Sequence, residues 1–194
     1  MTTASRPILE VVTASTRPGR VGRAFADWFI DVATEHGAFE VVDVDLAKVA
    51  LPFLDEPHHP KLGRYVHEHT KQWSATVARA DAFVFVTPEY NYGYSAVLKN
   101  ALDFLHAEWA DKAVGFLGYG GIGAGTRAIQ QLKQVVTTLR MVPVFEAVNI
   151  PFAAQALDEQ GRVRPDENRT LAATAMLDEL ARLTRKLRPA AFED

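Results

Sequence analysis

Five short apolar runs alternate with five segments whose apolar residues recur at helical spacing, and this alternation constrains the fold most strongly. We expect the apolar runs to be strands, at residues 8–13, 39–45, 83–86, 112–117 and 142–150. We expect the intervening segments to be helices, at about residues 22–37, 62–79, 95–105, 126–139 and 167–187. Alternating strands and helices form a parallel sheet with helices on both faces, joined by right-handed crossovers.

The strand order follows from the number of strands. A five-stranded chain of 194 residues fits the flavodoxin-like order 2-1-3-4-5 better than the six-stranded dinucleotide-binding fold. We therefore expect residues 1–194 to form a single α/β domain, a three-layer sandwich. In that fold the loops that begin at Ser15, Pro88 and Gly118 all open at the carboxyl edge of the sheet, where open α/β sheets bind ligands.

Composition excludes several classes of partner. The formal net charge is −3, which provides no electrostatic drive toward nucleic acid or an anionic membrane. No apolar run is long enough to cross a bilayer, and residues 1–7 lack the apolar segment of a signal peptide. The chain has no cysteine, so disulfides and thiolate metal sites are excluded. We expect a cytoplasmic protein with no nucleic-acid or membrane partner.

The first loop, residues 15–22, has the features of a phosphate-binding loop. It follows a strand and opens a helix, whose N-terminal amides and dipole attract anions. Ser15 adds a hydroxyl donor, Arg17 and Arg20 add fork-shaped cations, and Gly22 permits close backbone approach. The loop lacks the spaced glycines of a dinucleotide fingerprint and the lysine of a nucleoside-triphosphate loop, which argues against a kinase or ATPase. The alternative is a helix cap beside two solvated arginines.

Two further loops favour a flat, partly polar ligand. Residues 88–94 hold three tyrosines, a carboxylate and an amide directly after a buried strand. Tyr92 and Tyr94 either form a wall for an incoming ring or pack in a subunit interface. Residues 118–125 include five glycines, which indicates that the backbone approaches another group closely, although such a loop can also be a tight turn or a mobile lid.

Together these segments resemble the NADPH-dependent FMN reductase family of flavodoxin-like proteins, which includes quinone, chromate and azo-dye reductases. The motifs that carry the resemblance are Ser-Thr-Arg-Pro-Gly-Arg at 15–20, Pro-Glu-Tyr-Asn-Tyr at 88–92 with Leu-Lys-Asn-Ala-Leu-Asp at 98–103, the glycine loop ending in Gly-Thr-Arg-Ala at 125–128, and Leu-Pro-Phe-Leu-Asp-Glu-Pro at 51–57. The resemblance covers about residues 8–150.

The resemblance also implies which residues bind the cofactor. The FMN phosphate would be held by Ser15, Arg17, Arg20, Val21 and Gly22; one edge of the isoalloxazine would be lined by Pro88, Glu89, Tyr90 and Asn91; and its pyrimidine side would meet Gly118, Gly120 and Gly121. Two positions depart from the family pattern. Ala14 stands where the family often has glycine, and Gly120 stands where it often has serine, which removes one side-chain donor.

The implied activity is that of an FMN-dependent oxidoreductase. It would pass a hydride from NADPH or NADH via bound flavin to an oxidised acceptor such as a quinone, a flavin, an azo compound or a metal oxyanion. No protein acid, base or nucleophile is assigned to catalysis, and the histidines at 58–59 and 67–69 lack the spacing of a zinc site. The family also implies a homodimer or homotetramer.

The alternative from another class is a flavodoxin-like FMN-binding electron carrier or regulatory module without nicotinamide turnover. A carrier of this kind is normally strongly acidic, and a net charge of −3 argues against it. A phosphatase-like enzyme using the same anion loop would need a placed nucleophile, and the sequence offers none.

Overall fold

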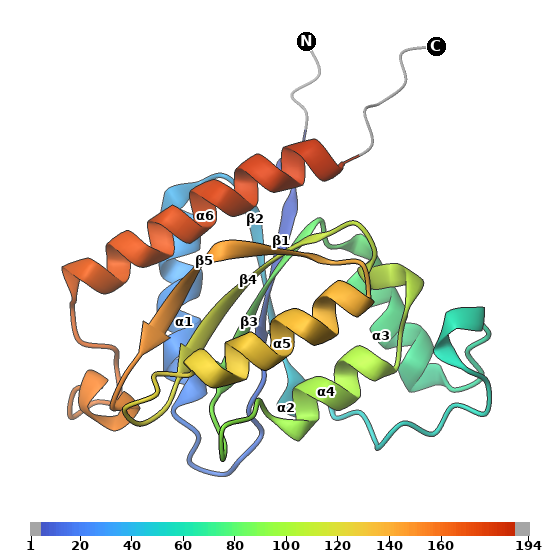
Figure 1. Cartoon of the computed structure of the whole chain (residues 1–194), viewed down its shortest axis with the longest axis horizontal. Coiled ribbons are helices and arrows are strands. Elements are labelled where there is room, and N and C mark those ends of the chain that lie inside the picture. The colour runs from blue at the N-terminus through green and yellow to red at the C-terminus, as the bar shows by residue number, and fades with distance from the viewer. Residues whose placement is uncertain (1–4, 189–194) are drawn as a thin grey trace.

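A computed structural model describes residues 5–188 and shows a five-stranded parallel sheet. The strand order is β2-β1-β3-β4-β5, which confirms the predicted topology (Figure 1). The strands are β1 (Ile8–Thr13), β2 (Glu40–Asp45), β3 (Ala82–Pro88), β4 (Ala113–Tyr119) and β5 (Val142–Ile150).

Helices cover both faces of the sheet. They are α1 (Gly22–His36), α2 (Leu46–Val49), α3 (Glu68–Arg79), α4 (Ala96–Asp103), α5 (Thr126–Thr138) and α6 (Glu167–Leu187), with 3₁₀ turns at Pro60–Leu62, Ala107–Trp109 and Ala153–Ala156. The core that contains α1 and α6 lies on one face, and the core that contains α3, α4 and α5 lies on the other (Figure 1). Within the described part of the chain, none of the helices is both long and apolar enough to span a bilayer.

Strand β3 is buried along its whole length, as the continuous apolar run predicts. Its side chains alternate between the two cores. Phe83 and Phe85 point toward the α3–α5 side, where the ring centroid of Phe83 lies 5.1 Å from that of Trp109. Val84 and Val86 point toward α1 and α6. The central strand therefore anchors both layers and fixes the height at which its carboxyl end emerges.

The predicted helix at 62–79 begins later than expected, at Glu68. Gly63 adopts a left-handed conformation with φ of 62° and ends the 3₁₀ turn before it. The Glu56 carboxylate then accepts hydrogen bonds from the amides of Val66 (2.8 Å) and His67 (3.0 Å), which holds this stretch extended. The short helix α2 was not predicted. It forms because Asp45 caps it, accepting from the amide of Ala47 at 3.0 Å.

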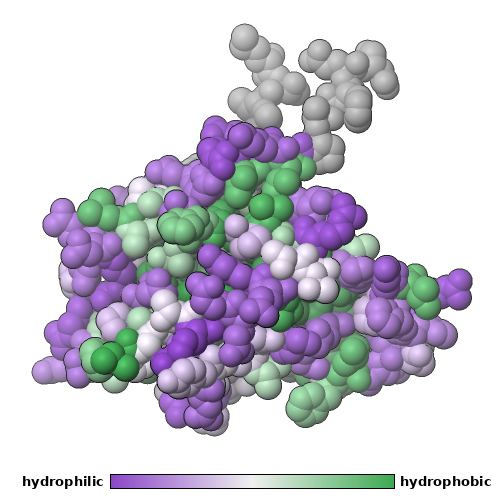
Figure 2. Space-filling view, in the orientation of Figure 1, coloured by the Kyte–Doolittle hydropathy of each residue, from purple (hydrophilic) through white to green (hydrophobic). Residues whose placement is uncertain are grey.

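Strand β5 forms one edge of the sheet. Hydrophobic side chains gather in the groove beside it, between α5 and α6 (Figure 2), and Phe145 is 89% exposed there. The β4–β5 register shifts between Val114 and Phe116, so the edge strand is bulged. A bulge twists an edge strand and reduces its tendency to pair with another chain.

A carboxylate lies buried in the central part of the sheet. Glu10 of β1 is fully buried, and its Oε1 accepts from Nε of Arg79 at 3.2 Å. Its Oε2 has no hydrogen-bond partner among the described residues. Burial raises the pKa of Glu10 above its ordinary 4.5, although Arg79 and Lys112 oppose the shift.

We predict that Glu10→Gln stabilises the protein at neutral pH by on the order of 1 kcal/mol. Folding the variant buries a neutral amide and not a charged carboxylate, and the half-exposed Arg79 that loses its partner stays hydrated. The sign follows from the raised pKa. Well below pH 4.5 the Glu10 carboxyl is protonated in both the folded and the unfolded state, so no charge is buried on folding. Above that pH the unfolded state ionises first, and the free energy of unfolding of the wild-type protein falls until the pH passes the folded-state pKa.

Urea unfolding of both proteins between about pH 4 and pH 8 measures this difference. Glu40→Gln, at an exposed position of β2, is the matched control and should show no such pH dependence. If the wild-type protein were more stable than Glu10→Gln at neutral pH, burial of the Glu10 carboxylate would not be destabilising.

Candidate functional site

The carboxyl ends of β1, β3 and β4 lie level with one another at one edge of the sheet. Thr13 pairs with Val86, and Val86 pairs with Leu117. The Ala14 amide extends this pairing by donating to the Val86 carbonyl at 2.9 Å. The three loops that the sequence marked therefore emerge from adjacent strands on the same side.

The first loop offers a donor set that suits an anion. Ser15 is buried, and its Oγ lies 3.3 Å from the Tyr90 hydroxyl of the second loop. Arg17 is exposed and forms no ion pair with another described residue. Val21 is the N-cap of α1, yet no side chain caps the helix there. A hydroxyl, a free guanidinium and the uncapped amides of a helix N-terminus together fit a phosphate group.

Arg20 is engaged differently from Arg17. Its Nη1 and Nη2 donate to the two carboxylate oxygens of Asp45, at 2.9 and 2.5 Å, and Nη1 also donates to the Ser15 carbonyl. The side chain of Arg20 is 18% exposed and that of Asp45 only 2%. The fork that the sequence predicted for a phosphate therefore faces a carboxylate of β2 in this structure.

The second loop is a tight turn braced by α5. Tyr90 and Gly93 exchange backbone hydrogen bonds of 2.8 and 2.9 Å, and the two residues between them, Asn91 and Tyr92, both have positive φ, at 50° and 73°. For a tyrosine this conformation is strained. The ring of Tyr92 lies 3.8 Å from the guanidinium carbon of Arg127, which holds the turn in place. Tyr90, Asn91 and Tyr92 are all exposed at this rim.

Glu89 connects the second loop to the third. Its carboxylate accepts from Nε of Arg127 at 2.5 Å and from the Arg127 amide at 3.2 Å, and its own amide donates to the Tyr119 carbonyl at 2.9 Å. The side chain is only 6% exposed. Both the amide and the carboxylate of Glu89 therefore make bonds within the protein. Pro88, which precedes it, is the buried last residue of β3.

Part of the glycine content of the third loop serves internal packing. Gly125 has φ of 81°, and a Cβ on it would lie 2.5 Å from the Cα and carbonyl carbon of Gly118, which the structure places inside β4 rather than in the loop. Gly120 donates to the Ile150 carbonyl at 3.2 Å. Gly121 is exposed, and a Cβ on it would meet nothing within 4 Å. Of the predicted contacts, Gly121 is thus the most open to a ligand.

Tyr119 connects the third loop to the first, and sequence reasoning missed it. It is the last residue of β4 and 5% exposed, and a Cβ added to Gly22 would overlap its hydroxyl. Burial raises the pKa of Tyr119 above its ordinary value. Its position at the end of a strand before a glycine-rich stretch was the only available signal. Gly22 is therefore needed for close packing against Tyr119.

A cavity of about 380 Å³ lies beside the first loop, between α2 and α4. Thr16 is its only contribution from the three loops, and the remaining walls are mostly apolar: Leu46, Ala47, Ala50, Leu51, Val97, Asn100 and Ala101. The Asn100 side chain closes one side by bonding the Pro52 carbonyl at 2.7 Å and the Leu54 amide at 3.0 Å.

The fold and this rim define a flavodoxin-like protein with a loop whose donors suit an anion, next to an aromatic turn and a glycine loop. The chain belongs to the NADPH-dependent FMN reductase family, whose model matches residues 9–155. The described structure shares its fold with a flavoenzyme NAD(P)H:(acceptor) oxidoreductase of Paracoccus denitrificans, with a TM-score of 0.73 at 22% identity over 93% of this chain and 98% of that one.

Two curated relatives extend the comparison. An NAD(P)H-dependent FMN reductase of Schizosaccharomyces pombe is 42% identical over 149 residues, covering 75% of this chain and 74% of the relative. An NAD(P)H:quinone oxidoreductase of Solanum tuberosum is 30% identical over 138 residues, covering 68% and 69%.

We predict that Gly125→Ala destabilises the fold by about 2 kcal/mol or more, because alanine is strained at positive φ and its Cβ meets backbone that cannot move aside. Gly121→Ala, in the same loop, is the matched control and should change stability by less than about 0.5 kcal/mol. Thermal unfolding of the two apo proteins compares them. If both variants lost the same stability, the close contact with Gly118 would not be the reason that position 125 requires glycine.

Proposed function

We propose that this chain is an FMN-dependent oxidoreductase that passes a hydride from NAD(P)H via bound flavin to an oxidised acceptor such as a quinone, a flavin or an azo compound. The observation that carries the proposal is the convergence of the three loops at the level ends of β1, β3 and β4. Family membership over residues 9–155 supports both the cofactor and the electron donor.

The residues present fit FMN, and each has a distinct task. Ser15, Arg17 and the first-turn amides of α1 would hold the phosphate, because they combine a hydroxyl, a cation and uncapped donors. The exposed turn at Tyr90 and the exposed Gly121, which has free space beside its Cα, would border the ring. When bound, FMN supplies the redox chemistry by taking up and releasing a hydride. The protein binds and orients, so no acid or base of this chain is required.

The rival function is an FMN-binding electron carrier or regulatory module without nicotinamide turnover. The weak net charge of −3 and the cationic first loop argue against a carrier. The names of the curated relatives, reductases and quinone oxidoreductases that use NAD(P)H, favour the enzyme. The proposal includes both NADPH and NADH as hydride donors.

We also propose that residues 1–194 act as one cytoplasmic FMN-binding domain that assembles as a homodimer or homotetramer. The segment before α3 supports assembly, since it exposes several large apolar side chains: Phe53 (85%), Leu54 (42%), Leu62 (59%) and Val66 (52%). Sedimentation of the purified protein tests this; a monomer at micromolar concentration would refute it.

The decisive test of the function is the visible spectrum of the purified protein after incubation with FMN. We expect flavin absorbance that bleaches when NADPH or NADH is added without oxygen and returns when a quinone follows. A protein that takes up no FMN would refute the proposal. A protein that binds FMN but is bleached by neither nucleotide would support the carrier instead.

We predict that Arg17→Ala weakens FMN binding by about 10- to 100-fold, because a charge-assisted contact to phosphate is lost, and leaves riboflavin binding nearly unchanged. Arg64→Ala removes the same charge from an exposed position in another loop and is the control. Flavin fluorescence quenching measures both ligands. Unchanged FMN affinity in Arg17→Ala would remove Arg17 from the phosphate site.

A further inference from the structure

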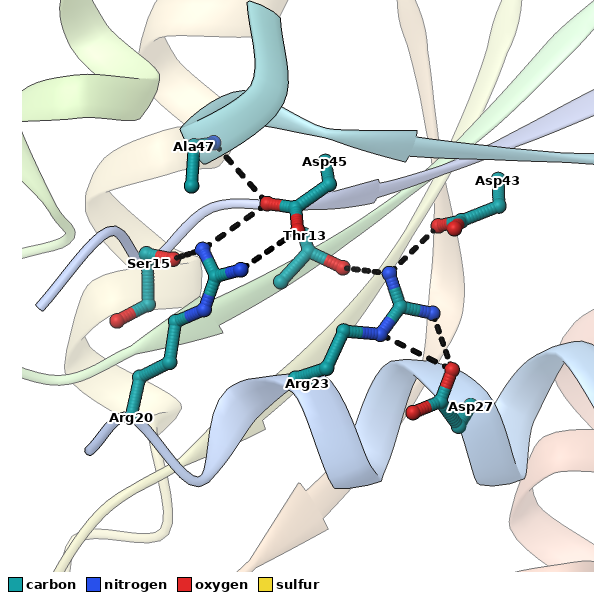
Figure 3. A network of polar contacts seen from close by, with 8 residues as sticks. All are labelled: Thr13, Ser15, Arg20, Arg23, Asp27, Asp43, Asp45 and Ala47. Carbon is teal, nitrogen blue, oxygen red and sulfur yellow. Dashed lines mark hydrogen bonds and ion pairs between the residues drawn. The ribbon is translucent and has the colours of Figure 1, made fainter. Parts of the chain in front are cut away.

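Two arginines, Arg20 in the loop just before α1 and Arg23 in the first turn of that helix, reach across the end of β1 to carboxylates of the neighbouring edge strand β2 (Figure 3). Arg20 meets Asp45 with both terminal nitrogens, and Arg23 meets Asp43 with one, at 2.8 Å. Arg23 is also shared with Asp27 of its own helix, so its partners are divided. The contact between Arg20 and Asp45 is the planar, two-point arrangement that fixes orientation as well as distance.

Both members of the Arg20–Asp45 pair are fixed by further bonds. Asp45 is the last residue of β2 and the N-cap of α2, accepting from the Ala47 amide at 3.0 Å. Arg20 also donates to the Ser15 carbonyl and thereby closes the loop on itself (Figure 3). One guanidinium thus connects the start of the loop, its end and the edge strand.

We infer that Arg20 and Asp45 form a positioning pair that holds the phosphate loop in its binding shape, and that Arg17 rather than Arg20 is the arginine that meets the phosphate. The inference rests on the proposed function, because it concerns how FMN is held. It changes the task that the loop motif implies for Arg20, from ligand to support.

Burial and charge support this division of tasks. Asp45 is 2% exposed, and a buried carboxylate that lost Arg20 to a ligand would be left with little water and only an amide as partner. Arg17 is exposed beside the uncapped start of α1. Moving Arg20 to a phosphate would therefore cost more than using Arg17, which has no partner to give up among the described residues.

The two assignments predict opposite signs for one substitution. If Arg20 were the phosphate ligand, Asp45 would compete with the phosphate for it, and Asp45→Asn would tighten FMN binding. If the pair positions the loop, the same substitution weakens FMN binding, because the two-point contact is lost. Asparagine still caps a helix well, so α2 is retained.

The experiment is a titration of the full-length apo protein with FMN and with riboflavin, which lacks the phosphate. For Asp45→Asn we expect the Kd for FMN to rise about tenfold while that for riboflavin changes less than about twofold. Asp43→Asn removes the other β2 carboxylate of this network and should change the Kd for FMN and the Kd for riboflavin by less than about twofold. Its partner Arg23 keeps the ion pair with Asp27, and Arg23 and Asp43 are partly exposed.

Two further variants guard against a folding artefact. Arg20→Lys keeps the charge but loses the fork, and we expect it to weaken FMN binding about as much as Asp45→Asn does; a direct phosphate ligand would tolerate lysine better. The double variant Arg20→Lys with Asp45→Asn should be no weaker than either single variant, since the two residues act as one unit. Thermal unfolding of the apo proteins reports any general loss of stability.

Three outcomes would overturn the inference. Tighter FMN binding in Asp45→Asn would make Arg20 the ligand. Equal weakening toward FMN and riboflavin, together with a lowered Tm, would reduce the pair to a purely structural role. Failure of the wild-type protein to bind FMN would refute the proposed function and this inference with it, whereas the first two outcomes leave the proposed function standing.

Discussion

The parallel pairing of β1, β3 and β4 is the constraint on which the candidate site depends. Because Thr13, Val86 and Leu117 lie in register, three loops from distant parts of the chain leave the sheet at the same height. The pairing is secured by β3, which is buried on both faces and contributes alternate side chains to both cores. The site is therefore first of all a consequence of strand order.

Side-chain contacts then turn the three loops into one surface. Ser15 meets Tyr90 between the first and second loops, Glu89 meets Arg127 between the second and third, and Tyr119 packs on Gly22 between the third and first. Each contact uses a polar or small residue that the motifs of the sequence mark as ligand-binding. Several residues of such a motif therefore hold the three loops together.

The sequence predicted the strands and the three loops well, because apolar periodicity and strand-end loops are local features, and it predicted the strand order because five strands in a chain of this length favour one topology. It placed the start of α3 too early, since neither the left-handed Gly63 nor the hold of Glu56 on the Val66 amide is visible in a hydrophobic pattern. It missed Tyr119, and it did not pair Arg20 with Asp45. The contact of Tyr119 with Gly22 and the pairing of Arg20 with Asp45 both depend on which strands lie side by side and on how far each side chain reaches. Only the assembled sheet determines these.

The electrostatics of the first loop follow from that neighbour. Counted along the chain, residues 15–23 carry three arginines, at positions 17, 20 and 23, and would be strongly cationic. In the folded protein β2 places Asp43 and Asp45 opposite Arg23 and Arg20, so the field at the loop is set largely by Arg17 and the helix dipole. Among the described residues Arg17 forms no ion pair, so in the proposed function it would be the cation that meets the phosphate, while the pairs that neutralise Arg20 and Arg23 would keep the loop in shape. Edge strand β2 thus sets much of the charge at the candidate site through its two carboxylates.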